Sequence, residues 1–168
     1  MSESASSATG WVAQLEAILP LFGHRNWIVV ADAAYPSQSR AGIETIVAGA
    51  DQADVLRKVL NAIKTSKHIR ANVYVDDELR FVPERDAPGV ENYREELDVL
   101  LADFTPNRLP HEKIIARLDQ SAQLFRVLIV KTDMTIPYTS VFFELDCGYW
   151  NAEAEQRLRE TILQADAE

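Results

Sequence analysis

The sequence predicts an α/β fold: a single domain in which helices pack on a mostly parallel central sheet. Two patterns predict this class. Strand-like apolar runs alternate along the chain with helical patterns, as they do in layered α/β domains. The run at residues 28–30 is also continuous and β-branched, which is typical of parallel strands buried on both faces. A length of 168 residues fits one compact domain.

The N-terminal region is expected to be a tail followed by a helix. Residues 1–8 are small and polar and resemble a flexible tail. Thr9 can cap a helix over residues 11–21, whose apolar positions follow helical spacing. We therefore divide the chain into this tail, a domain over residues 9–150 and a helical extension over residues 151–168.

The other elements follow from apolar periodicity and from turn residues. Asp51, with Asp54 three residues on, predicts a capped helix start. The expected helices cover residues 52–64, 90–104, 111–123 and 151–168. The expected strands cover residues 27–33, 71–75, 124–132 and 140–146. The last two strands look like a hairpin or a tight strand pair, so we expect an antiparallel part of the sheet near the C-terminus.

Composition argues against several classes of function. The formal charge of −9, from 17 basic and 26 acidic residues, disfavours nucleic acid and anionic membranes as partners. The single cysteine, Cys147, cannot form an intrachain disulfide, and the start of the chain lacks the features of a signal peptide, so we expect a soluble cytoplasmic protein. A Gly-rich phosphate loop, a Cys pair with metal spacing and a Gly-x-Ser-x-Gly motif are absent from the sequence.

Three residues are the main candidates for chemistry. His24 follows a glycine that permits unusual turns, although a histidine before a strand can also simply bond to backbone. Asp32 ends the strand at residues 27–33, at the sheet edge where α/β domains bind ligands, although it can also cap a loop. Tyr138 follows a proline, and a tyrosine in such a position more often packs in a turn than contacts a ligand. The acidic residues 76–78 read as a solvated strand end.

Two blocks of sequence, "GHRNWIVVADAAYP" and "AQLFRVLIVKTDMTIPYTSVFF", together resemble the RbsD/FucU family of D-ribose pyranases and L-fucose mutarotases. The resemblance spans roughly residues 18–148. Three departures stand out: Ser140 replaces the family's Asn, Asp133-Met134 replaces a Gly-Glu pair, and the chain continues beyond the family's usual end.

The resemblance implies a function and a set of site residues. His24 matches the catalytic histidine, Asp32 a substrate-binding aspartate and Tyr138 a sugar-contacting tyrosine, with Ser140 beside it. His111 matches a further substrate-binding histidine if the chain carries a few inserted residues after it. The implied activity is a cofactor-free, metal-free isomerase that interconverts ring forms or anomers of a ribose- or fucose-like monosaccharide, acting as a ring-like homo-oligomer, typically a decamer.

Two other interpretations stay open. The first is a non-catalytic monosaccharide-binding or regulatory module on the same fold, which the loss of the Asn at Ser140 favours. The second is a protein in which His24 and Asp32 only support the fold. The two differ in whether the chain binds a sugar at all.

Overall fold

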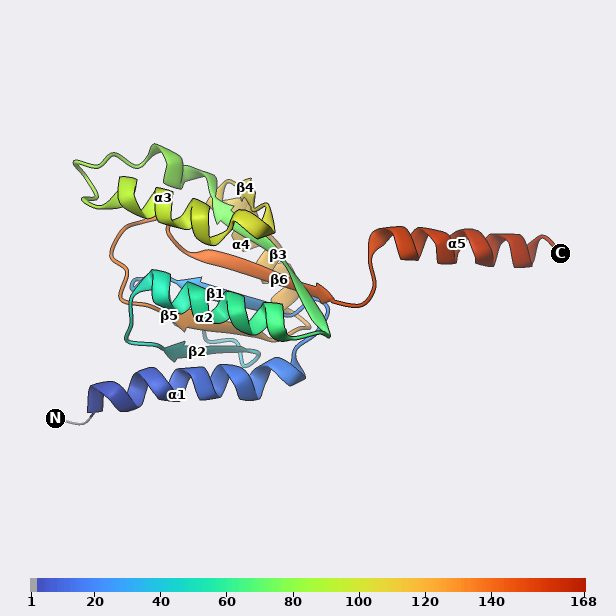
Figure 1. The fold of residues 1–168 in the computed structure, drawn as a ribbon, viewed down its shortest axis with the longest axis horizontal. Helices are drawn as coiled ribbons and strands as arrows, with labels where there is room; N and C mark the ends of the chain where they lie inside the picture. Colours follow the sequence, from blue (N-terminus) through green and yellow to red (C-terminus); the bar gives the residue numbers. More distant parts are fainter. Residues whose placement is uncertain (1–2) are drawn as a thin grey trace.

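One six-stranded sheet, in the order β2-β5-β1-β6-β3-β4, organises the chain (Figure 1). The structure, a computed structural model, describes residues 3–168 and the side chains of residues 10–168. β6 runs antiparallel to both of its neighbours, whereas the other pairs are parallel. The strands are β1 (Trp27–Ala31), β2 (Ile43–Val47), β3 (Ile69–Asp76), β4 (Asn107–Leu109), β5 (Val127–Lys131) and β6 (Val141–Cys147). The predicted α/β class with a mostly parallel sheet is confirmed.

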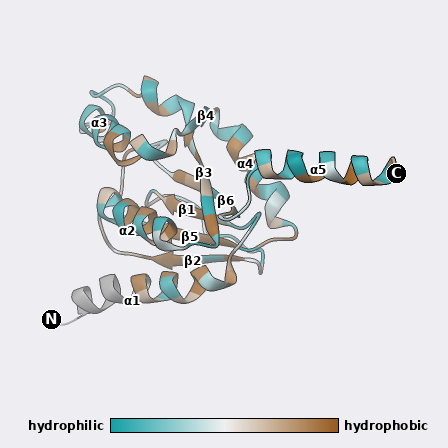
Figure 2. Cartoon of the chain, turned by 45° about the vertical axis from the view of Figure 1, so that its right-hand side comes forward, coloured by the Kyte–Doolittle hydropathy of each residue, from teal (hydrophilic) through white to brown (hydrophobic). Residues whose placement is uncertain are grey.

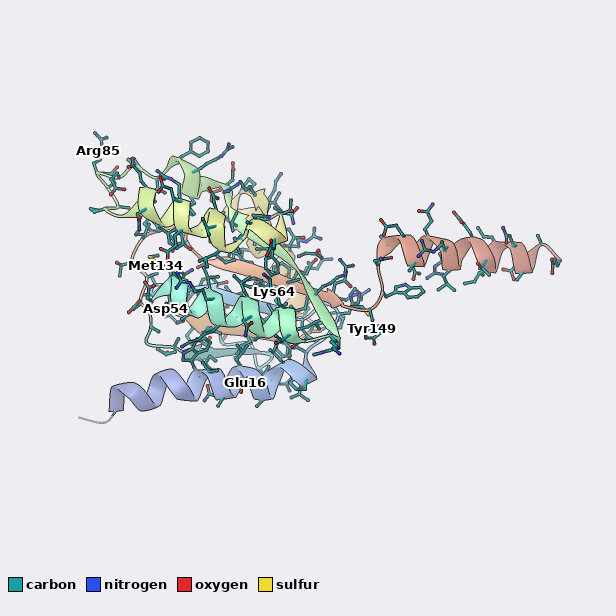
Figure 3. All side chains as sticks on the ribbon, viewed as in Figure 1. Glu16, Asp54, Lys64, Arg85, Met134 and Tyr149 are labelled. Atoms are coloured by element: carbon teal, nitrogen blue, oxygen red, sulfur yellow. The ribbon has the colours of Figure 1, made fainter. Side chains whose placement is uncertain are left out.

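Within residues 3–168, five α-helices accompany the sheet, and four of them cover it. They are α1 (Glu3–Ile18), α2 (Gln52–Thr65), α3 (Val90–Leu100), α4 (His111–Ala122) and α5 (Ala152–Asp166). Apolar side chains of α1, α2 and α3 form one core layer with one sheet face, and those of α4 form a second layer with the other face. α5 buries none of its residues and projects away from the sheet, with side chains in solvent along its length (Figures 1 and 3).

The two core layers meet at neighbouring residues of β6. Phe142 and Phe143 point to opposite faces of the sheet because successive strand residues alternate. Both are completely buried by the chain's own residues, Phe142 in the layer with α4 and Phe143 in the layer with α1, α2 and α3. The apolar colouring of the strands in Figure 2 follows from this two-sided burial. Neither side chain is therefore left exposed for a contact with another copy of the chain.

The position of β6 corrects one expectation. β5 and β6 do not form a hairpin, because β1 lies between them and bonds to both. β6 lies inside the sheet, since β3 pairs with its other side. Adjacency in the sequence suggested a strand pair, but the segment between the two strands crosses over β1.

Several element boundaries differ from the expected ones. α1 begins at Glu3, so Thr9 lies within the helix rather than at its start. Part of the expected tail, residues 1–2, lies outside the described residues. Asp51 is the N-cap residue of α2, but its side chain makes no capping hydrogen bond. β2 and β4 were not predicted: β2 is mostly exposed, and β4 has only three residues.

Among residues 3–168, no helix combines the length and the apolar character that crossing a membrane requires.

Phe143 offers a test of the core. We expect Phe143→Ala to lower the free energy of unfolding by about 3–5 kcal/mol, because it leaves a cavity in a fully buried layer. The matched control is Phe81→Ala. Phe81 is 68% exposed, and the Arg80 guanidinium lies 4.6 Å from its ring centroid, so its loss should cost less than about 1 kcal/mol. Urea unfolding at one fixed protein concentration measures both, and equal costs would contradict this description of the core.

Candidate functional site

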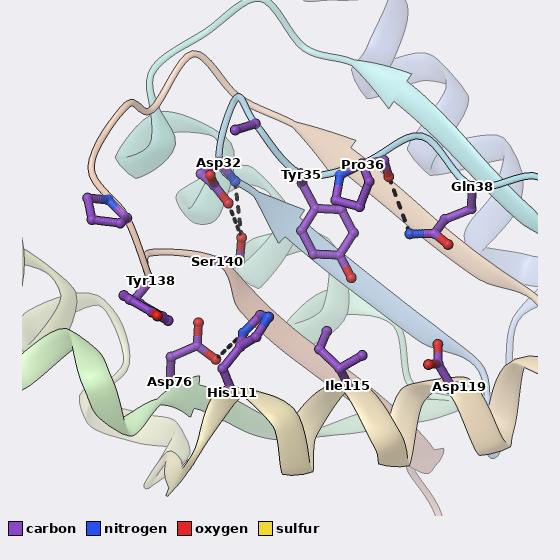
Figure 4. Close-up of a pocket in the computed structure, with 12 residues that line it drawn as sticks. Asp32, Tyr35, Pro36, Gln38, Asp76, His111, Ile115, Asp119, Tyr138 and Ser140 are labelled. Atoms are coloured by element: carbon purple, nitrogen blue, oxygen red, sulfur yellow. Dashed lines mark hydrogen bonds and ion pairs between the residues drawn. The ribbon is translucent and has the colours of Figure 1, made fainter.

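A cavity of about 470 Å³ lies where β1 and β3 end and β6 begins (Figure 4). Its volume falls within the roughly 300–1,000 Å³ that small-molecule sites usually have. The cavity also meets the first residue of α4, so residues far apart in the sequence share it. Its lining residues are Asp32, Ala34, Tyr35, Pro36, Gln38, Asp76, His111, Ile115, Asp119, Pro137, Tyr138 and Ser140.

The central feature of the cavity is a histidine paired with a buried aspartate. His111 opens α4, and its Nδ1 lies 3.0 Å from Oδ1 of Asp76, the last residue of β3 (Figure 4). A carboxylate can only accept a hydrogen bond, so His111 Nδ1 carries the proton when Asp76 is ionised. The imidazole then keeps Nε2 as a free proton acceptor.

Burial changes the acidity of Asp76. Its side chain is 1% exposed, and this loss of solvent raises the pKa of the carboxyl to about 6. The His111 imidazole opposes the rise, whereas the negative charges of Glu78 and Asp32 add to it. The Asp76 carboxyl therefore gains or loses its proton closer to neutral pH than an ordinary aspartate does, and it does so in hydrogen-bond contact with an imidazole.

The backbone of His111 is fixed separately from its ring. Both carboxylate oxygens of Glu78 accept a hydrogen bond from the His111 backbone N–H at 3.0 Å. This N–H belongs to the first turn of α4 and has no partner within the helix. Glu78 thus anchors the start of α4 and the histidine it carries.

Asp32 and Ser140 form a second polar pair on the other side of the cavity. The Ser140 hydroxyl donates to Asp32 Oδ1 at 2.7 Å and accepts from the Asp32 backbone N–H at 3.1 Å. The only proton of this hydroxyl is thereby used within the protein. Ser140 holds the Asp32 carboxylate in place, and the second carboxylate oxygen receives no hydrogen bond from the described residues.

Two tyrosines complete the walls. Tyr138 is 43% exposed, has a left-handed backbone (φ 61°) and meets the His111 ring edge-on, with 6.0 Å between the centroids. A non-glycine residue in this conformation is uncommon and marks a constrained position. Tyr35 is buried; its burial, and then the charges of Asp119, Asp76 and Asp32, raise its pKa to about 12. It therefore stays a neutral hydroxyl.

A buried hydrogen-bond network supports the segment before β6. Gln52 of α2 accepts from the Thr132 hydroxyl at 2.6 Å and donates to the Thr139 carbonyl at 2.8 Å. Tyr93 of α3 donates to the same carbonyl at 2.9 Å. These bonds fix both ends of the segment that carries Tyr138 and Ser140.

His24 does not reach this cavity. It precedes β1 whereas Asp32 follows it, and five strand residues span about 16 Å. Instead, His24 lines a second cavity of about 410 Å³, together with Arg25, Arg117, Gln120, Ser121, Glu144, Leu145 and Asp146. The backbone with positive φ in this turn belongs to Arg25 (φ 76°), and a side chain at Gly23 would meet nothing within 4 Å. The idea that Gly23 aims the histidine by an unusual conformation is therefore wrong.

The structure thus brings together four of the five predicted site residues, Asp32, Tyr138, Ser140 and His111, and separates them from His24. It adds Asp76, which was expected to be solvated. The sequence contained one signal for Asp76. It ends an apolar strand, and Asp32, which was predicted to be a site residue, directly follows another. Its carboxylate points inward while those of Asp77 and Glu78 serve other contacts.

Among residues 3–168, no group of three or more His, Cys, Asp or Glu side chains is arranged to hold a metal ion.

Comparison with known proteins yields a match over most of the chain. Residues 12–147 match the model of the RbsD / FucU transport protein family. No curated protein matches the chain.

Solved structures share the fold. RbsD from Bacillus subtilis, complexed with D-ribose, is 16% identical, with a TM-score of 0.55 over 79% of this chain and 91% of that one. The fucose mutarotase from Streptococcus pneumoniae, in complex with L-fucose, is 24% identical, with a TM-score of 0.52 over the same shares. FucU from Bifidobacterium longum is 12% identical, with a TM-score of 0.50 over 80% of this chain and 94% of that one.

The raised pKa of Asp76 predicts a specific pH dependence of stability. Between about pH 4 and 6 the folded chain keeps a proton that the unfolded chain has lost, so the free energy of unfolding falls as pH rises through this window. We expect this fall, about 3 kcal/mol from a shift of about two units, to disappear in Asp76→Asn. Urea unfolding from pH 4 to 7 measures it. Asp77→Asn is the control, and identical pH curves for the native chain and Asp76→Asn would contradict the assignment.

Proposed function

Because the chain belongs to the RbsD / FucU transport protein family, we propose that it is an isomerase that interconverts ring forms or anomers of a monosaccharide without a cofactor. One observation carries the proposal: a hydrogen-bonded pair, His111 and Asp76, faces the same small cavity as the Asp32 carboxylate. Sugars bound to two solved relatives of the same fold, D-ribose and L-fucose, support the substrate class.

The reaction requires only proton transfers. Ring opening adds a proton to the ring oxygen and removes one from the anomeric hydroxyl, which gives the open-chain aldehyde. Rotation about the bond to the carbonyl carbon and reclosure, with both protons returned, produce the other form. An imidazole that titrates near neutral pH suits both transfers.

Each residue of the cavity has a role in this scheme. In its imidazolium form, His111 gives a proton from Nε2 to the ring oxygen and takes it back when the ring recloses, while Asp76 holds the ring and stabilises its charged form. The free oxygen of Asp32 accepts hydrogen bonds from sugar hydroxyls, and Ser140 keeps this carboxylate oriented. Tyr138 offers an exposed aromatic face beside His111, against which the apolar face of a sugar ring can pack.

A second copy of the chain supplies His24 in this proposal. Ring opening needs an acid and a base on different parts of the sugar, and His24 cannot reach the cavity of its own chain. Its imidazole is half exposed, as a group that serves a neighbouring cavity must be. We therefore propose a homo-oligomer, decameric in keeping with the family resemblance, in which the His24 surface of one copy closes the cavity of the next.

A sugar-binding module without turnover is the second candidate function. It is favoured by the engagement of the Ser140 hydroxyl with Asp32, which leaves the sugar without a contact that the family's Asn provides. Either function fits a cytoplasmic protein, consistent with the free thiol of Cys147.

The catalytic proposal predicts the effect of removing each imidazole. We expect the native chain to accelerate ring-form exchange of D-ribose or L-fucose, and we expect His111→Asn and His24→Ala each to slow it about a hundredfold. Exchange NMR on each sugar measures the rates. His68→Gln is the control, since the His68 ring bonds to the carbonyls of Leu19 and Phe22 and lines neither of the two cavities. Saturable binding without acceleration by the native chain would favour the binding module instead.

The shared site predicts complementation between two inactive variants. When His24→Ala and His111→Asn chains are unfolded together and refolded as a mixture, some cavities pair an intact His111 side with an intact His24 side. We expect roughly a quarter of native activity from an equal mixture, because assembly combines the chains at random. Light scattering first establishes that each sample is an oligomer. Activity no higher than that of the separate variants would exclude a site built from two copies.

A further inference from the structure

His24 is held by a carboxylate at one of its two ring nitrogens. Its Nδ1 lies 2.7 Å from Asp146 Oδ1, and its Nε2 accepts a hydrogen bond from Arg25 Nε at 3.2 Å. Asp146 lies near the end of β6, and His24 lies in the turn before β1. The two meet because β1 and β6 are antiparallel neighbours.

Asp146 is itself fixed by contacts to both of its oxygens. The Cys147 backbone N–H donates to Oδ1 at 2.8 Å, and Arg70 donates to Oδ2 at 2.9 Å. Arg70 is in turn anchored by a bond from its Nε to the Cys147 carbonyl at 3.0 Å. The carboxylate therefore has little freedom to turn away from His24.

The same contacts keep Asp146 ionised. Burial alone would raise the pKa of its carboxyl, but the Cys147 amide, His24 and Arg70 together bring the pKa below its ordinary value. An ionised carboxylate can only accept, so the His24 nitrogen that faces it must carry a proton.

We propose that Asp146 is a positioning residue for His24, which keeps the proton on Nδ1 and leaves the Nε2 lone pair for the sugar. This inference rests on the proposed function, in which His24 transfers protons in a neighbouring cavity. Nε2 of His24 takes the proton of the anomeric hydroxyl, and the Asp146 charge stabilises the imidazolium that forms, while the His111 imidazolium gives the ring oxygen a proton from its own Nε2. Both protons return when the ring recloses, so His24, His111 and Asp146 end unchanged.

The other charged groups of this cavity do not substitute for Asp146. Glu144 lies two residues earlier on β6 and on the same strand face, but it accepts from Arg117 Nε at 3.2 Å. Arg25 can only donate a hydrogen bond, so its bond to Nε2 requires that this nitrogen carry no proton. A sugar that bonds to Nε2 must displace Arg25. The Arg25 guanidinium has a second contact, since it lies 5.6 Å from the centroid of the Phe125 ring.

The test compares Asp146→Asn with the matched control Glu144→Gln. The Asn amide can donate to Nδ1 and so move the ring proton to Nε2, the wrong tautomer for a base. We expect kcat to fall at least about tenfold with KM little changed, because the sugar contacts lie in the other copy's cavity. We expect Glu144→Gln to keep native kcat, and Asp146→Glu to recover part of the loss.

Nitrogen-15 NMR of the His24 ring provides a readout that does not depend on activity. The native chain should show a protonated Nδ1 and a bare Nε2, and Asp146→Asn should reverse or mix the two signals. If the native chain fails to accelerate ring exchange while these signals behave as expected, the proposed function fails but the positioning by Asp146 stands. Native kcat and unchanged ring signals in Asp146→Asn would overturn the inference.

A second variant covers the case in which Asp146→Asn does not assemble. Arg70→Gln removes the bond to Asp146 Oδ2 but leaves the carboxylate in place. We expect it to lower kcat by severalfold and to mix the two His24 ring signals in part. A native kcat with native ring signals in this variant would equally contradict the proposal.

Discussion

The insertion of one antiparallel strand between two parallel ones determines the arrangement of the cavity. In the ladder, Val141 of β6 lies opposite Val30 of β1 on one side and Val75 of β3 on the other. The preceding residue, Ser140, therefore enters the sheet beside the points where β1 and β3 leave it. These two strands deliver Asp32 and Asp76 to one place. A parallel strand at this position would bring its start to the opposite edge of the sheet, and the cavity would lose the segment that carries Tyr138.

The helix layer contributes to the same arrangement through buried polar groups. Gln52 opens α2, but its side chain serves the segment before β6 rather than the helix, with bonds to Thr132 and Thr139. Buried amides are costly when a partner is lost, so this network favours one conformation of the segment. Packing on one face of the sheet is in this way linked to the geometry of a cavity that opens near its edge.

Apolar periodicity was a good guide to the fold and a poor guide to pairing. It found the buried strands and the amphipathic helices, since two-sided burial leaves long apolar runs. It missed β2 and β4, which have little buried surface to mark them. It could not show that β1 separates β5 from β6, because strand order depends on contacts between residues distant in sequence.

The candidate site was predicted in part for similar reasons. A carboxylate after an apolar strand identified Asp32, but Asp76 was obscured by Asp77 and Glu78, whose charges made the stretch look solvated. Tyr138 was a candidate from its place after a proline, and the resemblance added His111 and Ser140. The sequence placed His24 and Asp32 at opposite ends of one strand, whereas the resemblance assigned both to one site. The length of that strand keeps the two residues of one chain apart.

α5 is expected to unfold separately from the rest of the chain. Its 15 residues bury no side chain, and its main anchors are local: the Asn151 cap and the bond from Trp150 to Glu155. A helix of this length is only marginally stable by itself in water. Its amide protons should therefore exchange with solvent through local fraying, whereas those of β1 and β6 should exchange only when the whole domain unfolds. On heating, the helical content of the whole chain would then combine two changes: a gradual loss from α5 and a cooperative loss from the packed domain.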